Sequence, residues 1–545
     1  MTDNVVLTGF MGVGKTAVGR EVARQLGRPF VDMDTQIEAR AGKSISRIFS
    51  EDGEAAFRTM ETALCRELAA EAGARHDLVD GAIIATGGGA LVNPENRALT
   101  RESGLVICLD ADPEEILHRL SDSNSRPLLD GPDPRTGVER LMAARRQAYG
   151  AIPWHINTTG LSIAQVAQRV IALIDAISLS VRHPGGSYAI RIGRGVLNHV
   201  GGALRAAGVP PETRIAMVSN DVVAPLYAAR VEEALRASGL HPVLCVIPDG
   251  EQHKTLATVA SLYDQFLAAG LDRTGAVLSL GGGITGDIAG FAAATFMRGV
   301  PFAQVPTSLL AMVDASVGGK TGVDLPQGKN LVGAFKQPLC VTIDPALLET
   351  LEAAEVRSGM AEVIKHTIIG DANLFQELNE AGTQRAPGDA FDTVTSAQIA
   401  RALQVKIAIV EEDPYEQDRR AVLNLGHTVG HALEKASRFK LRHGEAVSIG
   451  MVAAARVSAR VGLAEPSVVD SLEATLTAWG LPVRCSAPGW PEFRADSLWE
   501  AMAYDKKRRG DALRWVLPVA IGEVTIRDDV PHQAVAATLK EIGAR

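Results

Sequence analysis

The sequence has few aromatic residues, few cysteines and no long uncharged apolar run. Aromatic residues make up 4% of the 545 residues, so the core must rest on Val, Leu, Ile and Ala. The five cysteines are scattered without a C-x-x-C pair, which argues against a disulfide framework and a thiolate zinc site. No uncharged apolar run reaches the ~18 residues of a membrane span, and no targeting segment precedes the first apolar run. We therefore expect a cytoplasmic protein with no membrane partner.

The charge balance gives little reason to expect a nucleic-acid partner. Lys and Arg number 55 against 64 Asp and Glu, for a formal net charge of -9. Small anionic substrates remain compatible with this balance, because local clusters of Arg and Lys can bind them. The 46% hydrophobic and 22% charged residues are ordinary for a globular protein. The length exceeds the ~250 to 300 residues at which a single core stops growing, so several domains are expected.

The patterning divides the chain into an α/β part, a second α/β part and a helical part. Short apolar runs alternate with helical spacing in residues 1–176, which predicts a parallel sheet covered by helices. We interpret residues 177–187 as a linker, 188–346 as a Rossmann-like α/β region and 347–545 as a mainly helical region. Strands are expected at Val5–Leu7, Ile83–Ala85, Val106–Leu109, Tyr188–Ile192, Arg214–Val218, Val243–Ile247 and Ala276–Leu280.

A phosphate-binding loop stands near the start of the chain. The run Gly9-Phe-Met-Gly12-Val-Gly14-Lys15-Thr16 follows an apolar strand and precedes a helix expected over Ala17–Leu26. In that setting backbone N–H groups and the helix N-terminus cradle phosphates, and Lys15 neutralises their oxygens. The Thr16 hydroxyl would help to hold Mg²⁺. We expect ATP as the ligand of this loop, with Gly12, Gly14 and Ala17 lining it.

Polar motifs in a fixed order follow the loop and suggest its phosphate acceptor. Asp32-Met-Asp34 ends the next apolar run, and alternation would place both carboxylates on one side of an extended chain. One could serve Mg²⁺ and the other a substrate hydroxyl, although such a pair is often plain surface polarity. Next come Phe57-Arg58-x-x-Glu61, Thr86-Gly87-Gly88-Gly89, Arg126-Pro-Leu-Leu129 and Arg145-x-x-x-Tyr149. With these motifs, residues 1–176 resemble shikimate kinase.

The resemblance implies a role for each matching residue. Asp34 would bind ring hydroxyls, and Arg58 and Arg145 would grip the carboxylate with their planar guanidinium groups. Gly87, Gly88 and Gly89 would let the backbone approach the ring. Asp32 would lie near Mg²⁺ through water, and Arg126 would stabilise the transferring phosphoryl group from a lid over Ser121–Thr136. Gluconate and nucleoside monophosphate kinases share the loop, but the combination of Asp34, Arg58 and Arg145 favours a hydroxylated ring acid.

A second glycine-rich turn begins near the middle of the chain. The apolar run Val277–Leu280 leads into Gly281-Gly-Gly-Ile-Thr-Gly286-Asp287 before a helical stretch. This setting suits a dinucleotide pyrophosphate on backbone amides, although the turn differs from G-x-G-x-x-G. Further motifs are Pro248-Asp-Gly-Glu251-x-x-Lys254, Pro306-Thr307-Ser308, Asp314-Ala-Ser-Val-Gly-Gly-Lys320 and Gly328-Lys329-Asn330. Together they resemble 3-dehydroquinate synthase from about residue 188 to near the C-terminus.

A metal set can be argued from spacing as well as from the resemblance. His427-Thr-Val-Gly-His431 places two imidazoles one helical turn apart, and Glu362 lies on an expected helix. One Glu and two His with an open position suit a catalytic zinc. Spacing alone selects Glu362, His427 and His431. The resemblance instead implies Glu362, His427 and His443 as ligands of Zn²⁺ or Co²⁺, with His431 at the substrate.

The remaining site residues are implied by the resemblance alone. The implied substrate is 3-deoxy-D-arabino-heptulosonate 7-phosphate, which would lose phosphate and close to 3-dehydroquinate while NAD⁺ takes and returns a hydride. Catalytic roles fall to Lys320, Asp314 and His431. Residues expected at NAD⁺ are Glu251, Lys254, Gly283, Asp287, Thr307, Ser308, Lys320 and Lys329. Residues expected at the substrate are Arg298, Asn330, Lys365, Lys406, Arg420, Asn424, His431 and Lys506.

Two rival interpretations of the second part stay open at this point. A metal-dependent polyol dehydrogenase shares the α/β-plus-helical plan but needs fewer cations. A non-catalytic NAD sensor that regulates the kinase would have no use for a Lewis acid. The preferred hypothesis is a bifunctional enzyme that acts on small molecules and forms a homodimer through its second part.

Overall fold

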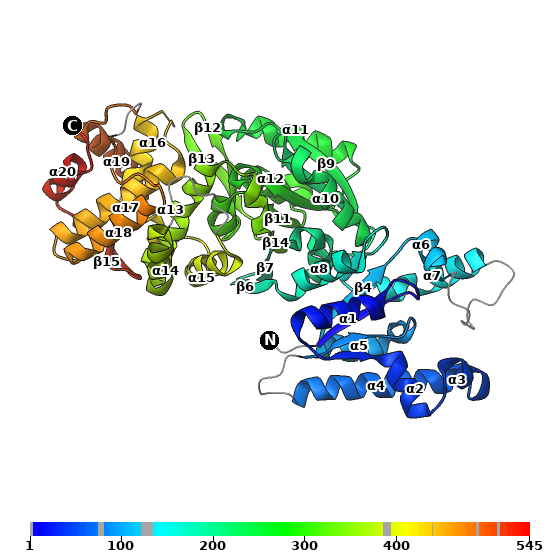
Figure 1. Ribbon diagram of the computed structural model, residues 1–545. Helices are drawn as coiled ribbons and strands as arrows, with labels where there is room; N and C mark the ends of the chain where they lie inside the picture. The colour runs from blue at the N-terminus through cyan, green and yellow to red at the C-terminus, as the bar shows by residue number, and fades with distance from the viewer. Residues whose placement is uncertain are drawn as a thin grey trace. The chain divides into compact units, whose positions relative to one another are not determined.

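The computed structural model describes residues 4–74, 81–120, 134–384, 394–438, 440–486, 490–509 and 513–545 (Figure 1). Both expected sheets are present, and the helical region follows them in the chain. The lid expected over Ser121–Thr136 falls mostly outside the described residues, and so does Arg126.

The first sheet has five parallel strands in the order β2-β3-β1-β4-β5. Its central strand is buried along its whole length, as an apolar run between two neighbours requires. The strands are β1 (Asn4–Gly9), β2 (Phe30–Asp32), β3 (Ile83–Ala85), β4 (Gly104–Asp110) and β5 (Trp154–Asn157). The helices are α1 (Lys15–Leu26), α2 (Met33–Ala41), α3 (Ile45–Glu51), α4 (Glu54–Ala74), α5 (Pro94–Ser103), α6 (Pro113–Leu120), α7 (Pro134–Gly150) and α8 (Ile163–Ile174).

Local sequence explains where the helices next to this sheet begin. Gly14 adopts φ 95°, a left-handed conformation that glycine accepts without strain, and α1 starts at the next residue. Ser162 and Gln165 form a reciprocal capping box at the start of α8. The α8 residues at positions 166, 167, 170 and 173 are buried, and this stripe packs α8 beside α1 (Figure 1). The phosphate loop is thereby fixed between β1 and α1.

The second sheet has seven strands in the order β6-β7-β14-β11-β10-β8-β9. Its strands are β6 (Ile177–His183), β7 (Gly186–Ile192), β8 (Arg214–Asn220), β9 (His241–Ile247), β10 (Ala276–Gly281), β11 (Phe302–Pro306) and β14 (Cys340–Ile343). Residues 177–187 are not the linker that we expected. Residues 177–183 form β6, which pairs antiparallel with β7 through the turn at residues 184–185. Half-buried Ile177 and Leu179 alternate with exposed serines, a period-2 pattern that fits an edge strand.

Helices alternate with the strands of this sheet along the chain and then make up most of its remaining length. The first group comprises α9 (Val200–Ala206), α10 (Ala224–Ala237), α11 (Leu256–Ala268) and α12 (Gly283–Thr295). The later helices are α13 (Ala353–Gly370), α14 (Ala372–Thr383), α15 (Ser396–Glu412), α16 (His427–Ala436), α17 (His443–Arg460), α18 (Pro466–Ala478), α19 (Ala495–Arg509) and α20 (His532–Glu541). Two antiparallel hairpins complete the fold: β12 (Lys320–Leu325) with β13 (Gly328–Phe335), and β15 (Trp515–Ala520) with β16 (Glu523–Arg527).

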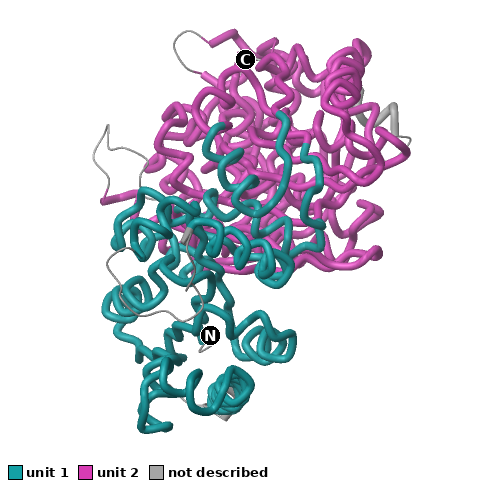
Figure 2. The backbone as a smooth tube through the Cα atoms, turned by 90° about the vertical axis from the view of Figure 1, so that its right-hand side faces the viewer, with its two compact units in different colours: residues 1–176, 195–215, 229–243 teal, residues 177–194, 216–228, 244–545 magenta. Residues whose placement is uncertain are grey.

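The chain groups into two compact units, coloured separately in Figure 2. Unit 1 holds residues 1–176 together with 195–215 and 229–243. Unit 2 holds residues 177–194, 216–228 and 244–545. Residues 1–176 thus fall within one compact unit, together with two short later segments. The domain bounds that we expect from the sequence stay a prediction.

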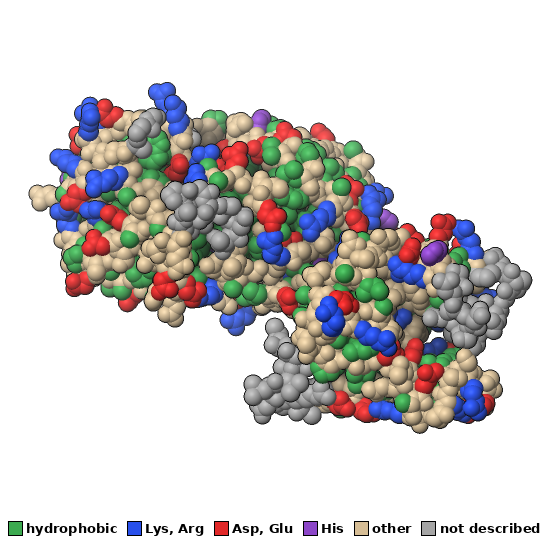
Figure 3. All heavy atoms as spheres, viewed as in Figure 1, with side chains coloured by type: hydrophobic (Ala, Val, Ile, Leu, Met, Phe, Trp, Pro, Cys, Tyr) green, Lys and Arg blue, Asp and Glu red, His purple; other side chains and the backbone are tan. Residues whose placement is uncertain are grey.

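The surface carries both signs of charge. On the face drawn in Figure 3, acidic and basic side chains are interspersed over the described residues. Among those residues, no helix combines the length and the hydropathy that crossing a bilayer would take. All five cysteines are buried, and none of them forms a disulfide.

Candidate active sites

The phosphate loop of unit 1 is held in shape by its own backbone carbonyls. The Lys15 ammonium donates to the carbonyl oxygens of Gly9 at 3.0 Å and Phe10 at 2.8 Å. Gly12 and Gly14 both have positive φ, at 79° and 95°. A glycine loop of this kind, with a lysine at the start of the following helix, suits a triphosphate.

The two carboxylates after β2 have separate structural positions. We expected Asp32 and Asp34 on one side of an extended chain, and this is wrong, because β2 ends at Asp32 and helix α2 begins at Met33. Asp32 is the N-cap of α2 and accepts from the Thr35 amide at 3.2 Å. Its other oxygen accepts from the Thr16 hydroxyl at 2.7 Å. Thr16 and Asp32 thus form an oxygen pair beside the phosphate loop, as Mg²⁺ prefers.

Asp34 lies in a second group of side chains beside the glycine run of residues 87–89. A Cβ placed on Gly87 would lie 2.6 Å from Asp34 Oδ1 and 2.7 Å from Glu61 Oε1. A Cβ on Gly89 would lie 2.8 Å from the Arg58 guanidinium. Only glycine therefore lets this backbone pass so close to the three polar side chains.

The two arginines of this group are held by different partners. Arg58 pairs with Glu61 at 2.6 Å and with Glu54 at 2.9 Å. Arg145 is buried, donates to the Gly88 carbonyl and lies over the Phe10 ring at 5.5 Å. Burial raises the pKa of Glu61, although Arg58 opposes that shift. The structure thus gathers all the predicted acceptor residues that it describes into one polar cluster around the glycine run of residues 87–89.

The glycine turn of unit 2 lies between β10 and α12. Gly282 is the N-cap of α12, and a Cβ on Gly281 would lie 2.6 Å from the Thr285 side chain. Gly283 is the first residue of α12, and Asp287 lies in the same helix, just over one turn later. The Thr307 amide donates to the Gly281 carbonyl at 3.0 Å, and Ser308 comes next in the chain. The expected residues Gly283, Thr307 and Ser308 therefore border one strand end, where dinucleotides bind in open α/β sheets.

A buried lysine joins several of the other residues expected at NAD⁺. The Lys254 ammonium donates to Asp287 and to Asn330, both at 2.6 Å. Lys329 pairs with Glu251 at 2.8 Å. Burial opposes the charge on Lys254, but Asp287 outweighs burial and raises its pKa. Asn330, which we expected at the substrate, thus contacts Lys254, one of the residues expected at NAD⁺.

Glu362, His427 and His443 converge in the helical region of unit 2. Each offers one ligand atom, and these atoms lie within 4.8 Å of one another. Oε1 of Glu362 is 3.8 Å from Nε2 of His427 and 3.5 Å from Nε2 of His443, while Lys365 contacts Oε2. Nδ1 of His427 lies 3.1 Å from the Leu425 carbonyl oxygen, and Nδ1 of His443 lies 2.9 Å from Glu434 Oε1. Such partners orient imidazoles toward a metal.

The charges in this cluster suit a cation. Burial alone would raise the pKa of Glu362, but Lys365 and the imidazoles hold it well below its ordinary value. Burial and then Lys365 lower the pKa of His427, so that its ring is a neutral base. Burial opposes protonation of His443, yet the carboxylates of Glu362 and Glu434 raise its pKa to about 10. The cluster thus holds an anionic Glu362, a neutral His427 and a protonated His443 between two carboxylates. A divalent metal fits this set, because it can replace the proton on His443.

The structure gathers the set that the resemblance implies, and not the set that spacing selects. His431 is outside the group of convergent ligand atoms, although its ring centroid lies 5.2 Å from that of His427. The role of each of these residues stays a proposal. Sequence reasoning missed Glu434, which orients His443. Its signal was available, because positions 427, 431 and 434 share one helical face.

Buried cations lie next to the metal cluster. Lys406 donates to Asp314 Oδ1 at 2.6 Å, and Lys365 contacts Glu362. Burial would raise the pKa of Asp314, but Lys406 and then Lys365 hold it far below its ordinary range. Arg420 is buried and donates to the Gly318 and Pro414 carbonyls. A buried His366, which we did not predict, lies 3.8 Å from Asp314.

Four other predicted residues have less defined surroundings. Lys320 is half exposed and pairs with Glu416. Arg298 is exposed and has a left-handed backbone, with φ 68°. Asn424 ends a 3-10 turn just before α16. Lys506 belongs to α19, but its side chain lies outside the described residues.

Comparison with known proteins identifies each part of the chain. A shikimate kinase family model matches residues 11–175. Models of the 3-dehydroquinate synthase N-terminal and C-terminal domains match residues 244–358 and 359–508. The 3-dehydroquinate synthase of a Synechococcus species is 42% identical over 369 residues, 67% of this chain and 99% of that protein. The chain belongs to the 3-dehydroquinate synthase family. It also carries a shikimate kinase domain.

A second family member and two solved structures are also similar to this chain. The 3-dehydroquinate synthase of Syntrophotalea carbinolica is 45% identical over 359 residues, 65% of this chain and 96% of that protein. A solved 2-epi-5-epi-valiolone synthase from Streptomyces hygroscopicus, with NAD⁺ and Zn²⁺ bound, is 30% identical with a TM-score of 0.58. It covers 65% of this chain and 96% of its own. A 2-deoxy-scyllo-inosose synthase complexed with carbaglucose-6-phosphate, NAD⁺ and Co²⁺ is 25% identical with a TM-score of 0.58. That match covers 67% of this chain and 99% of the other.

Proposed function

We propose that this chain is a bifunctional shikimate-pathway enzyme. One part phosphorylates shikimate with ATP and Mg²⁺, and the other converts 3-deoxy-D-arabino-heptulosonate 7-phosphate to 3-dehydroquinate and phosphate with NAD⁺ and Zn²⁺ or Co²⁺. The observation that carries the second activity is the convergence of Glu362, His427 and His443 beside buried lysines. The kinase activity rests on the phosphate loop and the polar cluster around residues 87–89.

In the kinase, each described residue has a task that its position permits. Lys15 neutralises phosphate oxygens, and Thr16 with Asp32 offers oxygens to Mg²⁺. Asp34, which lies beside Gly87, orients the acceptor hydroxyl. Arg58 and Arg145 pair with the ring carboxylate, as two guanidinium groups at one pocket suit that anion. Catalysis is then mainly positioning and charge stabilisation.

In the synthase, the protein supplies charge and orientation. When bound, the metal supplies a Lewis acid and NAD⁺ a hydride acceptor and donor. Glu434 and the Leu425 carbonyl hold the two imidazoles in the orientation that ligation needs. Lys365, Lys406 and Arg420 supply buried positive charge for an anionic substrate, and His431 lies within reach of the same position. A polyol dehydrogenase would have little use for so many buried cations.

Selective inactivation tests the proposal. Lys15→Ala should abolish phosphorylation of shikimate and leave phosphate release from the heptulosonate phosphate unchanged. His427→Ala should have the opposite effect. A heptulose 7-phosphate without the carboxylate should be a poor substrate of the synthase. If either variant, while folded, lost both activities or kept both, the assignment of two independent sites would be wrong.

Location and assembly are further proposals. The five buried cysteines, none of which forms a disulfide, support a reducing compartment, and we propose the cytoplasm. The mixed surface charge supports small-molecule substrates over nucleic acid. A homodimer through the synthase part stays a prediction, which light scattering on the purified chain would test.

A further inference from the structure

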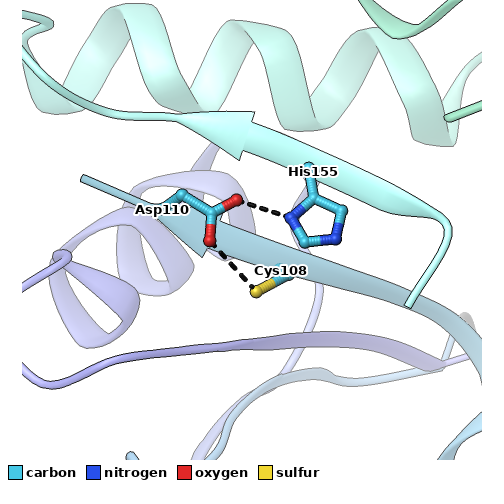
Figure 4. Close-up of side chains that lie close together, drawn as sticks. All are labelled: Cys108, Asp110 and His155. Atoms are coloured by element: carbon cyan, nitrogen blue, oxygen red, sulfur yellow. Dashed lines mark hydrogen bonds and ion pairs between the residues drawn. The ribbon is translucent and has the colours of Figure 1, made fainter. Parts of the chain in front are cut away.

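Three side chains that neither proposed activity uses meet at adjacent strand ends of unit 1. Cys108 and Asp110 lie on β4, and His155 lies opposite Cys108 on β5 (Figure 4). Nδ1 of His155 is 2.5 Å from Asp110 Oδ2, and the Cys108 sulfur is 3.6 Å from Asp110 Oδ1. One ligand atom from each residue lies within 4.8 Å of the other two.

The imidazole of His155 is oriented by its other nitrogen. Nε2 lies 2.9 Å from the Ile152 carbonyl, which can only accept, so Nε2 carries a hydrogen. Nδ1 then faces a carboxylate oxygen that, when ionised, also can only accept. A positive species must lie between them, either a proton or a metal ion. In metal sites the ligating histidine commonly donates its other N–H to a backbone carbonyl in this way.

The donor atoms and their spacing suit zinc. Bonds of about 2.0 to 2.3 Å at tetrahedral angles place zinc ligands about 3.3 to 3.8 Å apart. The sulfur-to-oxygen distance of 3.6 Å already falls in this range. The nitrogen-to-oxygen distance of 2.5 Å is that of a hydrogen bond, so Asp110 must retreat by about 1 Å to admit the ion. The Asp110 side chain is 40% exposed, which gives the ion a route and leaves a fourth position for water.

We propose that Cys108, Asp110 and His155 form a second divalent-metal site, of the zinc class, in the kinase part of the chain. Binding replaces the proton on His155 Nδ1 and the proton of the Cys108 thiol, and both are released to solvent. Burial and Asp110 raise the pKa of this thiol well above its ordinary value. Without metal, Cys108 is therefore a protonated thiol, and the metal-free cluster is the hydrogen-bonded arrangement that the structure shows.

The two metal sites differ in a way that spectroscopy can separate. The synthase cluster of Glu362, His427 and His443 offers only nitrogen and oxygen. The proposed site adds one sulfur, and Cys108 is the only cysteine in a convergent ligand group among the described residues. Thiolate coordination to Co²⁺ gives an intense charge-transfer band in the near ultraviolet, which nitrogen and oxygen ligands do not give.

The test is a Co²⁺ titration of the full metal-free chain, without nucleotide or Mg²⁺. We expect two equivalents to bind, with a thiolate band that Zn²⁺ abolishes by displacement. Cys108→Ser should lose the band and one equivalent, whereas Cys65→Ser, which alters another buried cysteine of unit 1, should keep both. His155→Gln should weaken the second equivalent about 10-fold or more, and circular dichroism should show each variant folded.

The wild-type result decides the matter even if a variant fails to fold. One equivalent with no thiolate band would overturn the proposal and leave an ion pair between Asp110 and His155. A band that persists in folded Cys108→Ser would place the metal at another cysteine and would also overturn it. A failure to detect shikimate kinase or synthase activity would not change the interpretation of the titration, because the titration measures metal binding and not turnover.

Discussion

Replacing Gly87 by alanine should disable the kinase through a contact that the structure defines. The new Cβ would lie 2.6 Å from Asp34 Oδ1 and 2.7 Å from Glu61 Oε1. Ordinary carbon-to-oxygen contacts are about 3.3 Å or longer, so these oxygens must move by about 0.6 to 0.7 Å. Glu61 cannot move freely, because it is buried and bound to Arg58 at 2.6 Å.

The size of the effect follows from that displacement. A misplacement of about 1 Å at a positioning residue can lower the rate about 100-fold, equivalent to about 2.7 kcal/mol. We expect kcat/KM for shikimate to fall by about this factor in Gly87→Ala, as measured by a coupled assay of ADP formation. Synthase activity in the same preparation should be unchanged.

Gly150→Ala is the matched control. Gly150 also belongs to unit 1, but a Cβ there would meet nothing within 4 Å, and its φ is not left-handed. The control should keep kinase activity within about 3-fold of wild type, since substitutions without new contacts have small effects. If folded Gly87→Ala did the same, the polar cluster around residues 87–89 would not be the acceptor site.

Three further predictions concern the synthase part. A zinc-selective chelator in excess Mg²⁺ should remove phosphate release but leave shikimate phosphorylation intact, and added Zn²⁺ or Co²⁺ should restore it; equal loss of both activities would contradict separate metal requirements. Glu434→Gln should weaken synthase metal binding about 10- to 100-fold by freeing His443, as measured by metal dialysis; unchanged affinity would remove the orienting role. Lys254→Met should raise the KM for NAD⁺ with little effect on the kinase, because Lys254 joins Asp287 and Asn330; an unchanged KM would place the cofactor elsewhere.

Periodic and glycine-rich segments were predictable from sequence because their causes are local. The strand, loop and helix from Asn4 to Leu26 follow from an apolar run, a glycine turn and amphipathic spacing. Residues 177–187 were misjudged because the edge strand β6, with its exposed serines, has a weak apolar signal. Its partner β7 follows at once in the chain, but β7 joins the rest of the sheet only through β14, which comes much later. The hairpins at residues 320–335 and 515–527 were also missed, although each is a two-stranded sheet of neighbouring segments.

The candidate site residues show the same division. Spacing along one helix could nominate His427 and His431 but could not place His443, which comes from the start of the next helix. Only the resemblance favoured His443, and the structure brings it to Glu362. Asp34 was expected on a strand, whereas a helix starting at Met33 carries it. The group of Cys108, Asp110 and His155 joins two strands 45 residues apart and had no local signal at all.

The ratio of phosphate released to NADH formed by the intact, metal-loaded chain tests the central claim most directly. With the heptulosonate phosphate and NAD⁺, we predict one dehydroquinate per phosphate and no accumulation of NADH, because the hydride is returned in each turnover. NADH accumulating in step with substrate loss, without phosphate release, would show a dehydrogenase and contradict the account.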